Sequence, residues 1–420
     1  MTLKHTIHIA RTAAISKQIR PLSRRKSQVM ESSLSPIATG LYKPNPLQAL
    51  HYGRNTVQQH LLDCLPSANS KAFIVTGTSL ATKTPLIQQI ETLLSSSSQP
   101  RHAGTFSQIG QHAPIKALDE ATDLVLADST IDTIISVGGG SPIDSAKAIS
   151  HRSHARTGRY LTHITVPTTL SAAECTFIAG FTGTDGVKTS VVAPGIYPAV
   201  ILYDSTYALH TPPSLFASTG IRALNHAVEL QYHPTATLVP CQALCLTAIS
   251  DLFTYLPQYK SNPRDENIIT RLFLAAFASL GFLGQNLKGG LGLSHTMGYA
   301  LGSPYGIPHG ITSCMTLGHV VKLKAACDPA DAAAVARILP VIGQQRSGDD
   351  VADANRVGDR ILRLVEDLGF KTTLTEKGVG RDQMQIILDR ATGGLASREE
   401  KSDKERKLVD GLRDLVESLY

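Results

Sequence analysis

The stretch from residue 134 to residue 149 limits the fold of this chain more than any other part of its sequence. It begins with the β-branched residues Ile134, Ile135 and Val137, which are typical of a short strand buried on both faces. Three glycines and a Ser-Pro pair follow, which favours a helix start. Such a turn leaves backbone N–H groups bare at the positive end of a helix dipole, so it suits a diphosphate. An ordinary strand-to-helix turn is the alternative, since the motif is neither GxGxxG nor a Walker A loop.

Short apolar segments alternate with helical segments through the first half of the chain. Besides the segment at 134, strands are expected at 71–77, 104–109, 161–169 and 199–204, and helices at 86–94 and 114–127. This alternation predicts a doubly wound, mostly parallel α/β sheet. Beyond Pro213 hydrophobic residues recur at helical spacing, and helices are expected at 266–283, 351–368 and 401–420. We therefore expect a dinucleotide-binding α/β domain over 46–211, an all-helical substrate domain over 212–420, and a cleft between them.

The first 45 residues are expected to form a basic tail and a linker. Residues 1–30 contain seven Lys or Arg residues and no Asp or Glu, a composition typical of a mitochondrial transit peptide. A disordered tail, or a true start at Met30, explains it equally, so we predict a cytoplasmic protein and keep mitochondrial import open. Because the whole chain has a net charge of +6, the remainder carries −1 and gives no reason to expect nucleic-acid binding. No apolar run approaches the roughly 18 to 20 residues of a membrane span.

Two groups of polar side chains could take part in chemistry. Thr168, Thr169 and Ser171 follow an expected strand, where hydroxyls could bond ribose, amide or phosphate, although such a turn is often only a turn. Three histidines stand in helical or glycine-flanked segments: His226, His295 and His309. They could bind a divalent metal, or one of them could pass protons, and their spacing alone does not decide between these.

Taken in order, these motifs resemble the iron-containing alcohol dehydrogenase superfamily. The matching segments are 138–147, 167–169, 224–229, His295 and 308–310. Residues 111–115 (Gln-His-Ala-Pro-Ile) and the general layout are similar to its maleylacetate reductase branch. The resemblance runs from about residue 47 to the C-terminus. It implies an NAD(P)-binding N-terminal domain, a helical C-terminal domain and hydride transfer between them, and a homodimer is expected because family members are commonly dimers.

The resemblance also implies roles for single residues of the cofactor site. Gly139, Gly140 and Ser141 would hold the diphosphate, and the rest of the site would be lined by Thr168, Thr169, Ser171 and Lys188. The strand at 71–77 ends in Val-Thr-Gly, without the acid that would exclude a 2′-phosphate, so either NADH or NADPH is expected.

Arg222 is the most consequential departure from the superfamily pattern. Metal-dependent members carry an aspartate four residues before the first histidine, the position that Arg222 occupies here. A guanidinium cannot ligate a metal and repels a divalent cation, so no catalytic metal is expected. We predict that Arg222 holds a substrate carboxylate while His295 or His309 donates a proton, with His226 beside them. Alternatively, Arg222 pairs with an internal acid such as Glu229; if a metal is bound after all, the three histidines would be its ligands.

A second departure is Tyr299, where alcohol dehydrogenases of the superfamily often place another histidine. Together these residues predict a metal-independent NAD(P)H-dependent reductase of an α,β-unsaturated keto acid or diacid, similar to maleylacetate reductase. The expected partner is a small carboxylate substrate, without nucleic acid or membrane. Two alternatives stay open: a metal-dependent alcohol or hydroxyacid dehydrogenase, and an inactive nucleotide-binding scaffold.

Overall fold

A parallel sheet forms the first half of the chain in a computed structural model, which describes residues 41–96, 99–184 and 188–420. The predicted basic tail therefore lies almost wholly outside the described residues. In spatial order the strands are β1 (Ala49–Gly53), β8 (Val200–Asp204), β5 (Thr162–Pro167), β4 (Ile131–Gly138), β2 (Lys71–Thr76) and β3 (His102–Phe106). All neighbouring pairs are parallel. The carboxyl ends of the strands consequently meet at one edge of the sheet.

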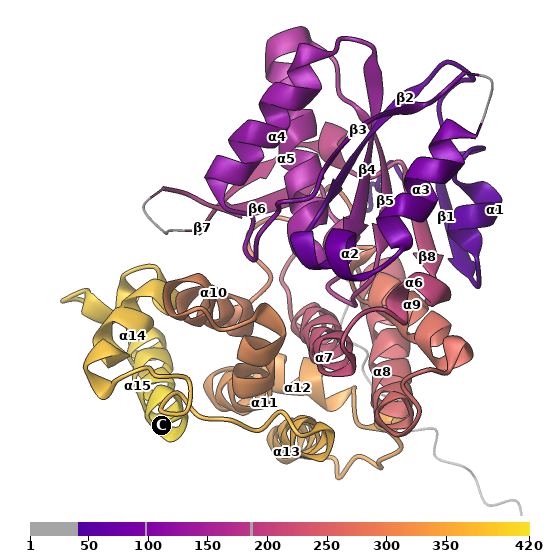
Figure 1. Cartoon of the computed structure of the whole chain (residues 1–420). Helices are drawn as coiled ribbons and strands as arrows, with labels where there is room; N and C mark the ends of the chain where they lie inside the picture. Colours follow the sequence, from indigo (N-terminus) through magenta and orange to yellow (C-terminus); the bar gives the residue numbers. More distant parts are fainter. Residues whose placement is uncertain (1–40, 97–98, 185–187) are drawn as a thin grey trace, which may run out of the picture. The chain divides into compact units, whose positions relative to one another are not determined.

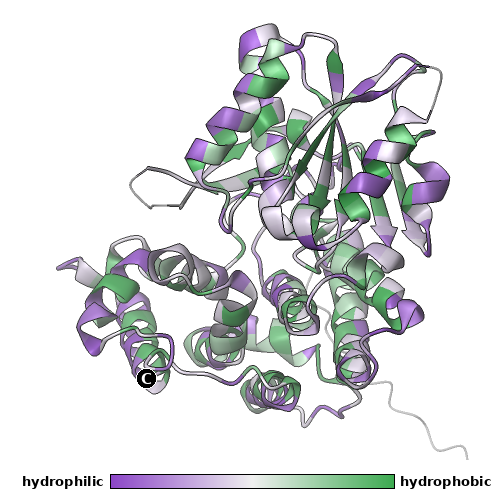
Figure 2. Cartoon of the chain, viewed as in Figure 1, coloured by the Kyte–Doolittle hydropathy of each residue, from purple (hydrophilic) through white to green (hydrophobic). Residues whose placement is uncertain are grey.

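Helices cover both faces of this sheet (Figure 1). One face is packed by α1 (Thr56–His60) and α3 (Leu86–Ser95), and the other by α4 (Ile115–Ala127) and α5 (Gly140–Thr157). Residues alternate between the faces: Ile74 packs toward α3, whereas its neighbours Phe73 and Val75 pack on the side of α4 and α5. In Figure 2 the central strands of the sheet are accordingly coloured as hydrophobic. The predicted doubly wound α/β fold is confirmed.

Three strands of this half, β1, β6 and β7, have no counterpart in the sequence prediction. The edge strand β1 is short and partly exposed, and it pairs on one side only, so its sequence lacks a buried apolar run. An antiparallel hairpin of β6 (Ile178–Thr182) and β7 (Lys188–Val192) lies outside the main sheet. Two short helices, α2 (Thr78–Lys83) and α6 (Ser205–Ala208), complete the half.

The second half contains helices and, among its described residues, no strand, as predicted. Its helices are α7 (Pro213–Glu229), α8 (Ala243–Ser261), α9 (Glu266–Leu280), α10 (Leu293–Tyr305), α11 (His309–Cys327), α12 (Pro329–Ala336), α13 (Asp350–Leu368), α14 (Met384–Thr392) and α15 (Asp403–Ser418). Every residue from Phe216 to Glu229 is buried, so α7 is a central helix rather than an amphipathic surface helix. The predicted boundary at 211/212 falls just before α7.

One helical stretch of the described chain, Leu238–Ser261, is long and apolar enough to cross a membrane by length and composition. Its buried residues, among them Ala248, Leu252 and Leu256, belong to the same hydrophobic core as α7 and α9. A core helix of a folded helical domain satisfies the same criterion of length and hydrophobicity.

Candidate active site

The glycine-rich turn between β4 and α5 forms a narrow cradle. The strand ends at Gly138, whose φ of 137° suits glycine, and the N-cap residue of α5, Gly139, provides no side chain to cap the first turn. A Cβ on Gly139 would lie 3.1 Å from the Thr169 methyl carbon, and one on Gly140 would lie 3.5 Å from the Ser171 hydroxyl. Any larger residue would therefore fill the space above the helix N-terminus, where backbone N–H groups favour an anion.

The loop after β5 forms the opposite wall of this cradle. The backbone N–H of Thr168 donates to the Gly138 carbonyl at 2.9 Å, which ties the loop to the glycine turn. The hydroxyl of Thr169 is buried without a hydrogen-bond partner among the described residues, as expected of a group that awaits a ligand. These contacts fit the diphosphate and ribose of a dinucleotide. Ser141 accepts a hydrogen bond from the backbone N–H of His112 at 3.1 Å.

Lys188 is the seventh residue of the predicted cofactor site. Its backbone belongs to β7 and pairs with Thr182, but its side chain lies outside the part that the structure describes. The prediction for Lys188 therefore stays a prediction. Thr76, at the end of β2, is buried and donates its hydroxyl to the Val137 carbonyl at 2.9 Å, so this hydroxyl serves the sheet.

The β5 loop also rests on the central helix of the second half. Leu170 donates its backbone N–H to the Thr219 hydroxyl on α7 at 3.0 Å, and Thr211 donates its hydroxyl to the Thr168 carbonyl at 2.8 Å. Arg222 lies one turn beyond Thr219 on α7. The cradle and the helix that carries Arg222 are thus joined directly.

Glu229 and His295 form a buried pair on this helical side. The Glu229 carboxylate accepts the backbone N–H of Ser294 at 2.7 Å and pairs through its second oxygen with the His295 Nδ1. A Cβ on Gly292 would lie 2.5 Å from this carboxylate, so only glycine leaves room for it. Burial raises the pKa of Glu229 to about 7. The carboxylate holds the His295 imidazole in one orientation, a contact that the sequence prediction missed.

His226 stacks on this pair. Its ring lies 4.9 Å from the His295 ring at an interplanar angle of 26°. Burial lowers the pKa of His226 well below its ordinary value, and the neighbouring His295 and Arg222 lower it further. His226 is therefore neutral, and its Nδ1 has no hydrogen-bond partner among the described residues.

Arg222 is a buried cation, only 9% exposed. A guanidinium nitrogen of Arg222 lies 3.5 Å from the Ser313 hydroxyl, and the guanidinium lies 5.9 Å from the centre of the Tyr299 ring. In the described chain it forms no ion pair within 4.0 Å with a carboxylate, because Glu229 is engaged with His295 instead. Glu229 acts on Arg222 electrostatically, but the two groups form no direct ion pair, so the alternative in which Arg222 pairs with Glu229 holds only at longer range. Burial lowers the pKa of Arg222, but a guanidinium stays charged in proteins.

A polar network holds the three helices of this site together. Asn225 on α7 donates to the hydroxyls of Ser294 on α10, at 2.9 Å, and of Ser313 on α11, at 3.1 Å. The start of α11 also packs closely on α7, since a Cβ on Gly310 would lie 2.7 Å from the Ser218 backbone. These bonds tie α7 to α10 and α11, while the side-chain oxygen of Asn225 has no hydrogen-bond partner among the described residues.

His309 contacts the rings of Tyr299 and His112. It is the first residue of α11, and its ring contacts the Tyr299 ring, at 6.0 Å between centroids, and the His112 ring, at 5.0 Å. No group of three or more His, Cys, Asp or Glu residues suited to a metal occurs in the described chain. Arg222 lies one turn before His226 on α7, so a permanent cation stands beside these histidines.

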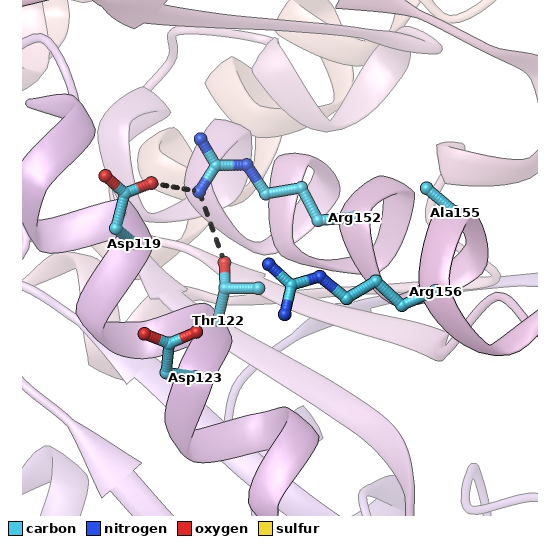
Figure 3. A pocket seen from close by; sticks show the side chains of 6 residues that line it. All are labelled: Asp119, Thr122, Asp123, Arg152, Ala155 and Arg156. Carbon is cyan, nitrogen blue, oxygen red and sulfur yellow. Dashed lines mark hydrogen bonds and ion pairs between the residues drawn. The ribbon is translucent and has the colours of Figure 1, made fainter.

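A separate pocket on the outer side of α4 and α5 contains none of these residues (Figure 3). Arg152 reaches from α5 to Asp119 on α4 at 2.6 Å, so the charges that line the pocket are partly paired. This pocket is a surface feature of two packed helices.

The profile of the iron-containing alcohol dehydrogenase family matches residues 48–205, and that of the C-terminal part of the Fe-containing alcohol dehydrogenase family matches residues 216–412. Maleylacetate reductase of Rhizobium sp. strain MTP-10005 is 27% identical over 70% of this chain and 76% of its own. Alcohol dehydrogenase 4 of Schizosaccharomyces pombe is 27% identical over 81% of each chain.

Solved structures agree on the fold. The crystal structure of the same Rhizobium maleylacetate reductase superposes with a TM-score of 0.73 at 23% identity, covering 91% of this chain and 99% of that one. A 1,3-propanediol oxidoreductase gives a TM-score of 0.75 at 23% identity, covering 90% of this chain and 100% of that one. At this identity the likeness concerns the fold alone.

Proposed function

The chain belongs to the iron-containing alcohol dehydrogenase family of NAD(P)-dependent oxidoreductases, and within this family we propose that it is a metal-independent reductase of an α,β-unsaturated keto acid or diacid. Maleylacetate reductases from several bacteria are among its relatives, which supports this branch of the family.

One observation carries the proposal: Arg222 is buried one turn before His226, and no carboxylate lies within 4.0 Å of its guanidinium in the described chain. Glu229 acts on it electrostatically from a greater distance, but the Glu229 carboxylate is bonded to Ser294 and His295. A buried cation without a directly bonded counter-ion is costly, and a substrate carboxylate would supply one. A substrate carboxylate matches the fork of a guanidinium in a bidentate pair. The same cation stands where the metal ligand of other family members would be, so it replaces a metal as the source of positive charge.

The cofactor fits the cradle of the α/β half. Gly139, Gly140 and Ser141 would hold its diphosphate, and Thr168, Thr169 and Ser171 would line the adjoining wall. When bound, the nicotinamide supplies the hydride. The Thr76 hydroxyl is bonded to the Val137 carbonyl, and β2 ends without the acidic residue that would exclude a 2′-phosphate. Both NADH and NADPH therefore remain acceptable.

The helical side supplies the proton. Of the two candidates, His295 is the better supported, because the Glu229 carboxylate fixes its imidazole while Arg222 lies on the adjacent helix α7. An oriented imidazole is a suitable general acid near neutral pH. His226 packs against its face and stays neutral, which limits the positive charge beside Arg222.

The test is steady-state oxidation of NADH and NADPH with maleylacetate and with simple aldehydes side by side. Turnover of the keto diacid, and a KM for it at least tenfold higher in Arg222→Met, would support the proposal, since a charge-assisted hydrogen bond contributes roughly 1.5–3 kcal/mol. Arg360→Met, an exposed arginine on α13, is the matched control and should leave KM unchanged.

Three outcomes would contradict the proposal. An unchanged KM in Arg222→Met would exclude the carboxylate clamp. Stoichiometric iron or zinc after mild purification, with turnover of aldehydes only, would indicate a metal-dependent alcohol dehydrogenase. Absence of any NADH or NADPH binding by fluorescence would indicate an inactive scaffold.

A further inference from the structure

The first residues that the structure describes lie against the loop that joins α9 to α10. We call residues 41–45 the N-terminal strap and residues 281–292 the α9–α10 loop. The backbone N–H of Gln285 donates to the Lys43 carbonyl at 2.9 Å, and the backbone N–H of Lys43 donates to the side-chain oxygen of Asn286 at 2.9 Å. Two segments far apart in the sequence are thus joined through both backbone groups of one residue.

Two side chains of the strap hold the beginning of the loop. Gly284 has a φ of 75°, which favours glycine, and a Cβ there would lie 2.9 Å from the Tyr42 ring. Asn45 donates its side-chain amide to the Gly281 carbonyl at 3.1 Å. Gly281 is the C-cap residue of α9, where carbonyls lack partners within the helix, so Asn45 supplies one. The strap is therefore fitted to the loop by a ring contact and a side-chain hydrogen bond.

The other end of the loop enters the candidate active site. Gly292 is the N-cap residue of α10, and a Cβ on it would lie 2.5 Å from the Glu229 carboxylate. Ser294, two residues later, donates its backbone N–H to the same carboxylate at 2.7 Å, and the next residue is His295. A displacement of the loop would therefore move the backbone that orients Glu229 and His295.

The middle of the loop is held from another direction by the turn after α7. The His233 imidazole donates to the Gly290 carbonyl at 2.9 Å, and the backbone N–H of Lys288 donates to the Thr235 hydroxyl at 2.9 Å. The loop itself forms no helix or strand among its described residues. Its course is therefore set by contacts with this turn and with the strap, because it has no regular backbone ladder of its own.

We propose that the N-terminal strap is a positioning element of the active site, with Tyr42 and Asn45 as its positioning residues. Both act through the α9–α10 loop, which sets where α10 begins relative to the Glu229 carboxylate. This inference rests on the proposed function, because it gives the strap a part in the Glu229–His295 pair that serves the proposed proton transfer. The contacts between strap and loop are independent of any substrate.

Hydrogen exchange of the full chain measures the loop directly. In Tyr42→Ala and in Asn45→Ala we expect the Ser294 N–H to exchange roughly tenfold faster, as for the loss of one hydrogen bond or an equivalent contact. Residues 136–150, which include the glycine turn, should exchange as in the wild type, since a chain end opens locally without global unfolding. The Kd of NADH should also stay unchanged.

The kinetic measurement is kcat at saturating NADH and maleylacetate. Both variants should lower kcat roughly tenfold with little change in KM, because a displaced Glu229–His295 pair reacts more slowly while the substrate still binds. Tyr42→Phe keeps the ring and should behave as the wild type. Lys43→Ala is the matched control, since Lys43 makes these two bonds with its backbone and is exposed.

Two results would overturn the inference. The first is wild-type exchange of the Ser294 N–H in both alanine variants. The second is faster exchange in residues 136–150 as well, together with a lower midpoint of denaturant unfolding. That combination would show that the strap stabilises the whole fold instead of positioning the loop.

The outcomes separate this inference from the proposed function. If maleylacetate is not turned over but exchange of the Ser294 N–H depends on Tyr42 and Asn45, the strap stands and the proposed reaction fails. If maleylacetate is turned over with a KM that depends on Arg222, while both alanine variants match the wild type in exchange and in kcat, the reaction stands and the strap fails.

Discussion

The two sides of the candidate site are built on different physical principles. The cradle in the α/β half consists of backbone groups and small hydroxyls, and its shape depends on the absence of side chains at Gly139 and Gly140. The helical side consists of buried ionisable groups, Arg222, Glu229 and His295, drawn from two helices. On the proposed function, the first side selects its ligand through the space above the two glycines and through the dipole of α5. The second side places charged groups next to the reacting substrate. Changes to the two sides should therefore affect different measured quantities.

The largest expected effect comes from removing the charge of the Glu229–His295 pair. In Glu229→Gln the amide cannot hold the imidazole as the carboxylate does, and we expect kcat to fall roughly 100-fold, as for other residues that orient a functional histidine. The Kd of NADH should stay unchanged, because the cradle is not touched. Glu399→Gln, an exposed acid, is the control. A loss of NADH affinity that parallels the loss of kcat would show that the two sides are not independent.

The same carboxylate should make stability depend on pH. Burial raises the pKa of Glu229 from 4.5 to about 7, so the folded protein binds this proton more tightly than the unfolded chain. The resulting stabilisation is complete below pH 4.5 and is lost as the pH rises through about 7.

Denaturant unfolding of wild type and Glu229→Gln at pH 5 and pH 8 measures this contribution of Glu229 to the free energy of unfolding. Between these values the wild type should lose about 2 kcal/mol of unfolding free energy more than the variant does. Parallel pH profiles of the two proteins would mean that the pair with His295 keeps Glu229 charged throughout.

A change in the cradle should have a smaller effect, and it should alter cofactor binding instead of kcat. In Gly139→Ala the new methyl group would lie 3.1 Å from Thr169 and intrude on the diphosphate site, so the Kd of NADH should rise about tenfold, or about 1.4 kcal/mol. The KM for substrate at saturating NADH should change little. Gly290→Ala, where nothing lies within 4 Å of the new Cβ, is the control. An unchanged Kd would remove the glycine turn from the cofactor site.

The difference between the two sides also explains which features of the structure could be predicted from the sequence. The glycine turn, the Ser-Pro pair and the flanking apolar strand are contiguous, so local rules predicted both the strand β4 and the helix α5. The hairpin of β6 and β7 was missed, because its Thr- and Gly-rich strands carry no buried apolar run. The edge strand β1 was missed for the same reason.

The helical side shows the limit of such rules. Arg222 was identified through the resemblance to the iron-containing alcohol dehydrogenases, as a departure at the position four residues before His226. The partner of His295, by contrast, is Glu229, which lies 66 residues earlier in the chain, and no local pattern connects the two. The three histidines appeared equivalent in the sequence, yet the fold pairs two of them and turns His309 toward His112.

The sequence by itself determined the α/β and helical halves and the glycine turn between β4 and α5, because each depends on residues close together in the chain. Only the tertiary structure decided that no carboxylate lies within 4.0 Å of Arg222 in the described chain, that Gly292 makes room for Glu229, and that the His112 ring contacts the His309 ring. These features depend on which side chains meet when separate helices and loops pack, and the electrostatic cost of a buried charge exists only once that packing has excluded water.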